Sequence, residues 1–207
     1  MSEQNAESHP LATSWVFWEM GTEKDYAAAV RQLGDPFSSV ESFWNYWSST
    51  LKPSDVFSDG VKKVLVDGRE IKALALFREG IKPAWEDPLN MNGSDVVCAK
   101  SLSLEAADLH WEAIVFALIG EVLDNEQYIC GARCVFRQKG KGQFKFEMWV
   151  KDMNEERAFQ LRARLADILA VSNLSCKPAF QLVEADFIHD KRGKDESHTP
   201  KGGKKYQ

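Results

Sequence analysis

The sequence lacks any apolar run that approaches the roughly 20 residues needed to span a bilayer. The N-terminal stretch MSEQNAESHP also lacks a basic region followed by an apolar segment, which is the pattern of a secretory signal. Cysteine is scarce, and Cys98, Cys130, Cys134 and Cys176 form no paired CxxC pattern. We therefore expect a cytoplasmic protein with reduced thiols and no structural metal.

The sequence also lacks the patterns that accompany common enzyme chemistry. There is no nucleophile motif, no glycine-rich phosphate loop and no metal-ligand spacing. One alternative is an acid–base pair of Glu86 and Asp87, with His9 or His110 nearby. Adjacent carboxylates on a loop usually point apart, so the sequence favours a protein that is not an enzyme and needs no cofactor.

Aromatic residues, in contrast, are abundant. The chain has seven tryptophans and twelve phenylalanines in 207 residues, enough for one substantial domain with a large core. The net charge is −5, but residues 191–207 hold six basic and two acidic side chains, a net of +4, which leaves −9 for the rest. An acidic body argues against a broad nucleic-acid-binding face, although it allows a small basic patch.

Apolar residues at helical spacing predict three helices, over 38–50, 103–123 and 154–171. Ser38 followed by Glu41 has the spacing of a capping box at the first helix. The second helix is expected to start near Ser103, and Asn154 is the expected N-cap of the third. Segments with a different pattern lie between the three helices.

Those segments carry β-branched and aromatic residues, several with a period of two, and predict strands over 15–20, 63–77, 95–102, 128–138, 143–150 and 178–186. Asp67-Gly68 and Gly140-Lys141-Gly142 are hairpin signals. Strands interrupted by three helices predict an α+β fold, in which an antiparallel sheet is covered by helices on one face.

Residues 82–88 read KPAWEDP, a proline-bracketed loop with an aromatic residue and two acids. Trp85 is either a core anchor or a platform for a flat ligand, and the stretch alone favours the core. Glu86 has two acceptor oxygens, which match the two adjacent donors of guanine. A guanine methylated on its imidazole ring is cationic and gains a further attraction to an aromatic face. Tyr26, in the polar stretch EKDYA, is the candidate second ring, or else an ordinary surface tyrosine.

Arg137, Lys139 and Lys141 recur at every second residue of the hairpin over 133–149. Strand geometry places such residues on one side, where three positive charges repel one another unless an anion lies between them. Phosphate suits both side-chain types, since arginine grips it as a fork and lysine as a point charge. A solvated hairpin tip is the alternative, and the hairpin alone does not choose between them.

These motifs occur in a recognisable order: HPL…W..W, V.SFW, P.WED, W…..LIGE and CGA…..R.K. The order resembles the eukaryotic translation initiation factor 4E family, the messenger-RNA cap-binding proteins, from His9 to about Trp149 and more loosely through the third helix. The resemblance implies a cupped domain over 9–188, with a curved antiparallel sheet, three helices on its convex back and a cap pocket on its concave side. Residues 1–8 are then a disordered segment, and 189–207 a flexible basic tail.

The resemblance also implies roles for particular residues of the pocket. Trp85 and Tyr26 would sandwich the methylated guanine, and Glu86 would hydrogen-bond to its edge. Trp149 would lie near the methyl group. The cap phosphates would contact the basic hairpin, at Arg137, Lys139 and, approximately, Lys141.

A partner site is implied on the convex face, where the scaffold subunit of initiation or a repressor docks a short helical peptide. Its residues would be His9, Pro10, Val40, Trp44, Ile119 and Gly120. Trp44 would be central, whereas without the resemblance we would interpret it as core. The protein would be a monomer that bridges capped messenger RNA and a scaffold, without a membrane or a metal.

Several positions depart from the family pattern. Tyr26 stands where tryptophan is usual, and Asp95 replaces a basic residue. Glu112 and Ala113 stand where leucine and glutamate are common in the partner site. Such divergence is similar to that of protozoan paralogues, kinetoplastid ones included, for which a more heavily methylated cap is a candidate target. A regulatory paralogue that stores or represses messages is the alternative function.

Overall fold

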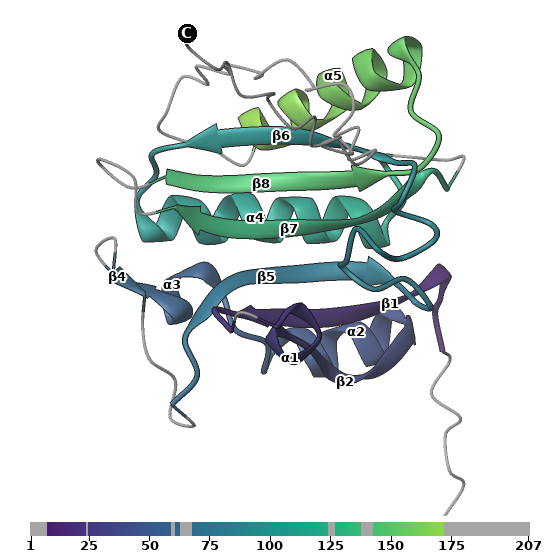
Figure 1. Ribbon diagram of the computed structural model, residues 1–207. Helices are drawn as coiled ribbons and strands as arrows, with labels where there is room; N and C mark the ends of the chain where they lie inside the picture. The colour runs from purple at the N-terminus through teal and green to yellow at the C-terminus, as the bar shows by residue number, and fades with distance from the viewer. Residues whose placement is uncertain are drawn as a thin grey trace, which may run out of the picture.

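Six antiparallel strands form the central sheet, in the order β2-β1-β5-β7-β8-β6 (Figure 1). They are β1 (Pro10–Gly21), β2 (Val30–Ser39), β5 (Ile71–Arg78), β6 (Ser94–Lys100), β7 (Ile129–Arg137) and β8 (Gln143–Val150). A small second sheet pairs β3 (Phe57–Ser58) with β4 (Val61–Lys62). The computed structural model describes residues 8–23, 25–58, 61–62, 68–123, 127–137 and 143–171.

Three longer helices accompany the sheet: α2 (Val40–Trp47), α4 (Leu104–Ile119) and α5 (Glu155–Val171). Two further helices, α1 (Tyr26–Ala29) and α3 (Pro53–Val56), have four residues each. In Figure 1, α2 and α4 lie behind the sheet, and α5 contacts both α4 and β6. This arrangement confirms the predicted α+β fold with helices on one face. No helix in the described ranges is both long and apolar enough to cross a membrane.

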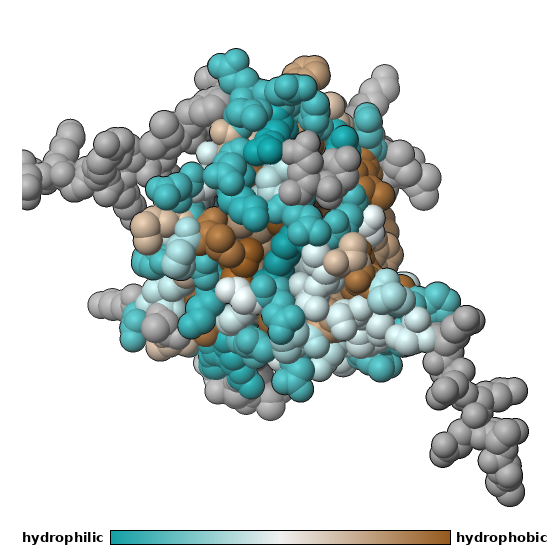
Figure 2. All heavy atoms as spheres, turned by 90° about the vertical axis from the view of Figure 1, so that its right-hand side faces the viewer, coloured by the Kyte–Doolittle hydropathy of each residue, from teal (hydrophilic) through white to brown (hydrophobic). Residues whose placement is uncertain are grey.

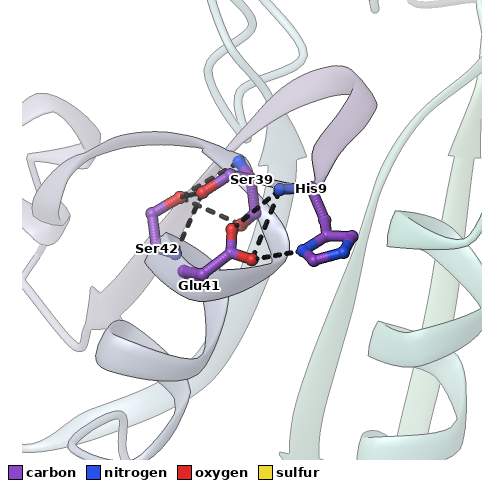
Figure 3. Close-up of polar contacts among 4 residues, drawn as sticks. All are labelled: His9, Ser39, Glu41 and Ser42. Atoms are coloured by element: carbon purple, nitrogen blue, oxygen red, sulfur yellow. Dashed lines mark hydrogen bonds and ion pairs between the residues drawn. The ribbon is translucent and has the colours of Figure 1, made fainter. Parts of the chain in front are cut away.

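The first helix begins later than the sequence suggested. Ser39 is the N-cap of α2, and its hydroxyl accepts a hydrogen bond from the backbone N–H of Ser42 at 3.1 Å (Figure 3). The predicted box of Ser38 with Glu41 is therefore wrong by one residue, because β2 keeps the backbone extended through Ser39. The two other expected caps are confirmed: the side chains of Ser103 and Asn154 accept from backbone N–H groups of the first turns of α4 and α5.

Strand β2 was not predicted at all. Its sequence, VRQLGDPFSS, contains Gly34 and Pro36, which are poor residues for the interior of a strand. The strand lies at the edge of the sheet, where one side needs no partner and proline is tolerated. Pairing with β1 therefore overrides its weak local preference.

Some predicted elements fall outside the described residues. These are residues 63–67 of the strand expected over 63–77, the turn residue Asp67, the Gly140-Lys141-Gly142 turn and the strand over 178–186. The terminal segments 1–7 and 189–207 also lie there, as does Cys176. The antiparallel pairing of β7 with β8, which ends at Arg137 opposite Gln143, agrees with the predicted hairpin.

The alternating side chains of the strands form two apolar clusters. The larger lies between sheet and helices and includes Phe17, Leu76, Phe146 and the helix residues Phe43 and Trp111. The smaller lies on the other side of the sheet, which we call the open face, and consists of Ala75, Phe77, Ile81, Cys130 and Trp149, with Trp18 packed against it. The open face is thus the side away from α2 and α4.

Three of the four cysteines are described, and all three are free and buried, in agreement with the expectation of reduced thiols. Burial raises the pKa of Cys130 to about 11 and the pKa of Cys134 well above its ordinary value. The thiolate is the reactive form, so these thiols are chemically quiet at neutral pH.

Candidate functional site

Trp85 lies face to face on Trp149. The ring centroids are 3.9 Å apart and the planes are inclined by 21°. Trp149 is only 1% exposed, whereas Trp85 keeps 38% of its surface accessible. The ring of Phe77 meets Trp149 edge-on at 5.5 Å. Trp85 is therefore neither fully buried in the core nor free of contacts. One face of its ring covers Trp149 on the open face of the sheet.

The loop that carries Trp85 is held by its own side chains. Asp87 accepts hydrogen bonds from the backbone N–H groups of Lys82 (2.9 Å) and Leu89 (3.0 Å). The amide of Asn90 donates to the carbonyl oxygens of Lys82 (2.8 Å) and Ala84 (2.9 Å). The carboxylate of Asp87 is thus used structurally, and the pairing of Glu86 with Asp87 as an acid–base couple gains no support from this geometry.

Tyr26 approaches the same loop through its hydroxyl. The phenol donates a hydrogen bond to the carbonyl oxygen of Pro83. Burial raises the pKa of Tyr26; Glu86 and Glu147 act in the same direction, whereas Arg133 opposes them. No ring contact between Tyr26 and Trp85 is found in the described part of the chain. The structure brings the two residues to one place without the expected sandwich, which stays a prediction.

A charged cluster surrounds Trp149 that the sequence analysis did not identify. Arg133 and Glu147 lie directly opposite each other on β7 and β8. The Nε of Arg133 donates to Oε2 of Glu147 at 2.7 Å, and Lys145 contacts Oε1 at 2.8 Å. The guanidinium carbon of Arg133 lies 4.6 Å from the centroid of the Trp149 ring. The signal was present in the alternation of Lys145, Glu147 and Trp149, which shows that these three residues share one face of β8.

The charge state of this cluster follows from its contacts. Burial of Glu147 opposes ionisation, but Arg133 and Lys145 more than offset it, so the pKa of Glu147 lies below its ordinary value. Asp95, on β6 opposite Trp149, behaves differently. Burial and the nearby charge of Glu147 raise the pKa of Asp95, while Lys145 and Arg133 oppose the shift. Of the two carboxylates, Glu147 is therefore the one that its cationic neighbours stabilise in the ionised form.

The predicted phosphate contacts are only partly described. Arg137 is exposed at the end of β7, opposite Gln143. Lys139 and Lys141 lie outside the described residues. Lys145, which the sequence analysis did not select, lies between the row of Trp149 and the row of Arg137, because its partner on β7 is Val135. The described cations on this face of the hairpin are thus Arg133, Lys145 and Arg137.

The family model described as eukaryotic initiation factor 4E matches residues 10–199. The chain belongs to this family. Initiation factor 4E-1 of Capsicum annuum is 32% identical over 163 residues, 76% of this chain and 64% of that protein, so the chain spans less than two thirds of this relative. These matches confirm the family that the motif order suggested.

Two solved nematode members of the 4E family have the same fold. Caenorhabditis elegans eIF4E-3, in complex with the 4E-binding protein Mextli and a cap analog, has a TM-score of 0.66 and 25% identity and covers 80% of this chain and 87% of that one. Ascaris suum eIF4E-3 with an m2,2,7G cap has a TM-score of 0.60 and 28% identity and covers 80% and 84%.

On the helix side of this 4E-family fold, Trp44 is 51% exposed and Val40 lies exposed beside it on α2. The ring of Trp44 contacts Phe116 on α4, with centroids 5.6 Å apart. Ile119 is half-buried and Gly120 is exposed at the C-terminal end of α4. These facts confirm that Trp44 is a surface aromatic and not core. Figure 2, which shows the right-hand side of Figure 1, has patches of hydrophobic residues on an otherwise largely hydrophilic surface.

The N-terminal residues expected in the partner site are tied to α2. Nδ1 of His9 lies 2.7 Å from Oε1 of Glu41, and the backbone N–H of His9 also donates to this carboxylate (Figure 3). The carbonyl oxygen of His9 accepts from the N–H of Val40 at 2.9 Å. The hydrogen bonds from His9 lower the pKa of Glu41 to about 2. Pro10 then begins β1, so His9, Pro10 and Val40 lie together.

Proposed function

We propose that this protein binds the 5′ methylated guanosine cap of messenger RNA on its open face. The observation that carries the proposal is the stack of a partly exposed Trp85 on a buried Trp149. Lys145 and Arg137 follow Trp149 on the same face of the β7–β8 hairpin. Bases stack on aromatic side chains for about 1–3 kcal/mol each, and a cationic methylated ring adds to this. Such a function needs no catalysis, metal or cofactor.

The strand register supplies a direction for the ligand. Trp149, Lys145 and Arg137 follow one another along the open face of the β7–β8 hairpin. Trp149 lies four residue positions along β8 from Lys145, which is about 14 Å at about 3.4 Å per residue. We propose that a nucleotide with its base near Trp149 directs its phosphates along this row, toward Lys145 and Arg137. Lys139 and Lys141, which lie outside the described residues, stay candidates from the sequence.

Glu86 is the proposed reader of the base. Its side chain is exposed, and its neighbour Asp87 is occupied by loop hydrogen bonds, so Glu86 is the free carboxylate beside Trp85. Two carboxylate oxygens match the ring N–H and amine of guanine. Tyr26 would stack on the second face of the base after its hydroxyl leaves the carbonyl of Pro83.

A more heavily methylated cap is the second candidate ligand, supported by the Ascaris suum neighbour that holds an m2,2,7G cap. Two methyl groups on the exocyclic amine remove both of its N–H donors. Glu86 would then accept a single hydrogen bond, and apolar contact would replace the other. Competition between the two cap analogues for one site decides which of them this protein prefers.

On the helix side, we propose that the exposed surface of Trp44 and Val40, with His9, Pro10, Ile119 and Gly120, docks a helical peptide of a scaffold or repressor. The Caenorhabditis elegans neighbour in complex with a 4E-binding protein supports this proposal. Glu112 and Ala113 on α4 alter the charge along that surface, so a partner with a basic residue near Glu112 fits best. We also propose that residues 9–188 form the cap-binding domain and that the protein acts as a cytoplasmic monomer that links message and scaffold.

The alternative function is that of a regulatory paralogue. It would use the same cap site and the same partner site, but it would store or repress messages and not recruit a scaffold for initiation. The replacements at Glu112 and Ala113 are the observation that favours it, because they change the partner site and leave the open face intact. A pull-down with wild type and Trp44→Ala separates the two functions. A scaffold initiation subunit retained by wild type alone supports recruitment, and a wild type that retains only a repressor supports storage or repression.

The cap proposal is tested by retention on immobilised 7-methylguanosine triphosphate. Wild type should be retained and eluted by the free methylated nucleotide but not by unmethylated guanosine triphosphate. Trp85→Ala/Glu86→Ala should pass through. The matched control is Phe159→Ala/Glu156→Ala, which removes an exposed aromatic and an exposed acid from α5. Elution of wild type by both nucleotides alike would contradict the proposal.

A further inference from the structure

Trp149 is held from several directions at once. Trp85 stacks on it at 3.9 Å, the guanidinium carbon of Arg133 lies 4.6 Å from its centroid, and Phe77 meets it edge-on. Its indole N–H also donates to Oε2 of Glu147 at 3.3 Å. Of these contacts, Trp85 belongs to a loop, whereas the other three come from strands of the central sheet.

Glu147 links the indole to the guanidinium. The same oxygen, Oε2, accepts from Nε of Arg133 and from Nε1 of Trp149, while Oε1 is occupied by Lys145. Glu147 is 2% exposed, so water does not compete for these bonds. A fixed carboxylate with both oxygens occupied leaves the indole one orientation in which its N–H is satisfied.

We propose that Arg133 and Glu147 form a positioning pair that fixes the Trp149 indole and thereby sets the preference for a methylated over an unmethylated guanine ring. This inference rests on the proposed function of the open face. The pair acts through Trp149 and makes no contact with the ligand itself. Because the pair and the indole belong to the sheet, Trp149 stays in place when Trp85 moves to stack on a ligand.

The preference for methylated guanine follows from how much affinity the methylated and the unmethylated ligand each lose if the Trp149 indole turns. The methyl group of the cap is the part of the ligand proposed to meet Trp149, and an indole in a fixed position meets it without a cost of ordering. An unmethylated ring has no such group, so its affinity depends mainly on Glu86 and the phosphates. Loosening Trp149 therefore weakens the methylated ligand more than the unmethylated one.

Stability alone does not explain the pair. Replacing a buried ion pair by apolar residues of similar volume is often neutral or stabilising, whereas removing one partner leaves a buried charge unpaired. The double substitution Arg133→Met/Glu147→Met therefore removes the positioning contacts without leaving either of these two charges unpaired. It also frees the ammonium of Lys145, so thermal unfolding has to show that the variant is folded. Arg133→Lys is the second variant, since it keeps the charge but loses the planar fork that covers the indole.

The chain contains a matched control on another tryptophan. The guanidinium carbon of Arg78 lies 4.6 Å from the ring centroid of Trp15, and Nη1 of Arg78 pairs with Oε1 of Glu121 at 2.9 Å. Trp15 belongs to the larger cluster between sheet and helices. Arg78→Met/Glu121→Met thus removes a cation–aromatic pair of the same geometry from a tryptophan that takes no part in the proposed site.

The experiment has one measurement without ligand and one with it. Without ligand, hydrogen exchange of the Trp149 indole N–H is followed by NMR, with thermal unfolding as the check of folding. With ligand, the dissociation constants of 7-methylguanosine triphosphate and guanosine triphosphate are measured and their ratio taken. Arg133→Met/Glu147→Met should speed the exchange and lower the ratio by about tenfold, the size of one lost aromatic contact. Arg133→Lys should lower the ratio less, and the Arg78 control should leave both readouts unchanged.

The outcomes separate this inference from the proposed function. If wild type discriminates and both folded Arg133 variants keep its ratio and its slow exchange, the pair has no positioning role. If the variants speed exchange and wild type does not discriminate, the positioning role stands and the cap proposal fails. A loss of ratio in the Arg78 control of the same size as in the Arg133 variant would also overturn the inference.

Discussion

Trp85 packs on Trp149, with 3.9 Å between ring centroids and 21° between ring planes. The ring that is proposed to read the cap is thus already engaged with an aromatic partner. Binding then exchanges one stacked contact for another, and the net gain depends on the positive charge of the methylated base. A neutral ring offers no such gain, so the contact itself opposes unmethylated ligands.

Glu86 gives the first prediction. Glu86→Gln should weaken binding of 7-methylguanosine triphosphate by about tenfold or more, because a hydrogen bond to a charged group contributes about 1.5–3 kcal/mol. Isothermal titration calorimetry measures the change. Glu79→Gln, an exposed acid in the turn after β5, is the matched control and should bind like wild type. Equal affinities of the two variants would remove Glu86 from the site.

Asn90 gives the second prediction, which concerns the loop. The side chain is buried and donates to the carbonyls of Lys82 and Ala84. Asn90→Ala leaves both acceptors without this donor and should reduce the free energy of unfolding by about 1–3 kcal/mol. Urea denaturation measures this loss. Cap affinity should fall as well, because Trp85 and Glu86 lie on the loosened segment; a variant with wild-type stability would contradict the proposed role.

Trp44 gives the third prediction. Trp44→Ala should abolish docking of a 4E-binding helical peptide, since large aromatic residues carry much of the free energy of such interfaces. Cap binding should be unchanged, because α2 lies on the other side of the sheet. The control is Phe159→Ala on α5, another aromatic residue, 73% exposed and outside the proposed patch. Fluorescence anisotropy of a labelled peptide measures both, and equal losses would argue against a specific site.

The pair of His9 and Glu41 gives a prediction about pH. The pKa of Glu41 is about 2, below the ordinary 4.5, chiefly because the His9 side chain hydrogen-bonds to the carboxylate. The ionised contact therefore stabilises the fold fully above about pH 4.5, and this contribution is lost as the pH falls from about 4.5 to about 2. Carbon NMR of the Glu41 carboxyl group follows the titration. His9→Ala should return the midpoint toward 4.5, and a shared midpoint would show that the contact is absent in solution.

Local patterns were enough for much of the fold. Alternation predicted β7 and β8, and helical spacing with the caps Ser103 and Asn154 placed α4 and α5. Strand β2 was missed because its glycine and proline weaken the local signal and the edge position restores it. The N-cap of α2 was misplaced by one residue because β2, paired with β1, keeps the backbone extended through Ser39.

The candidate site was likewise predictable only in part from the sequence. Trp85 and Glu86 stood out because a proline-bracketed loop with an aromatic and two acids is unusual. The stack of Trp85 on Trp149 depends on where a loop meets a distant strand, which no local pattern contains. Arg133 and Glu147 are 14 residues apart and meet only through the exact register of one hairpin, so their pairing was missed.

The most direct test follows tryptophan fluorescence while the purified protein is titrated with 7-methylguanosine triphosphate and, separately, with guanosine triphosphate. We predict strong, saturable quenching by the methylated nucleotide and little by the other, because only the cationic ring draws Trp85 from Trp149. The quenching should be greatly reduced in Trp85→Phe. Equal quenching by both nucleotides, or none by either, would contradict the central claim that the open face of this protein reads a methylated cap.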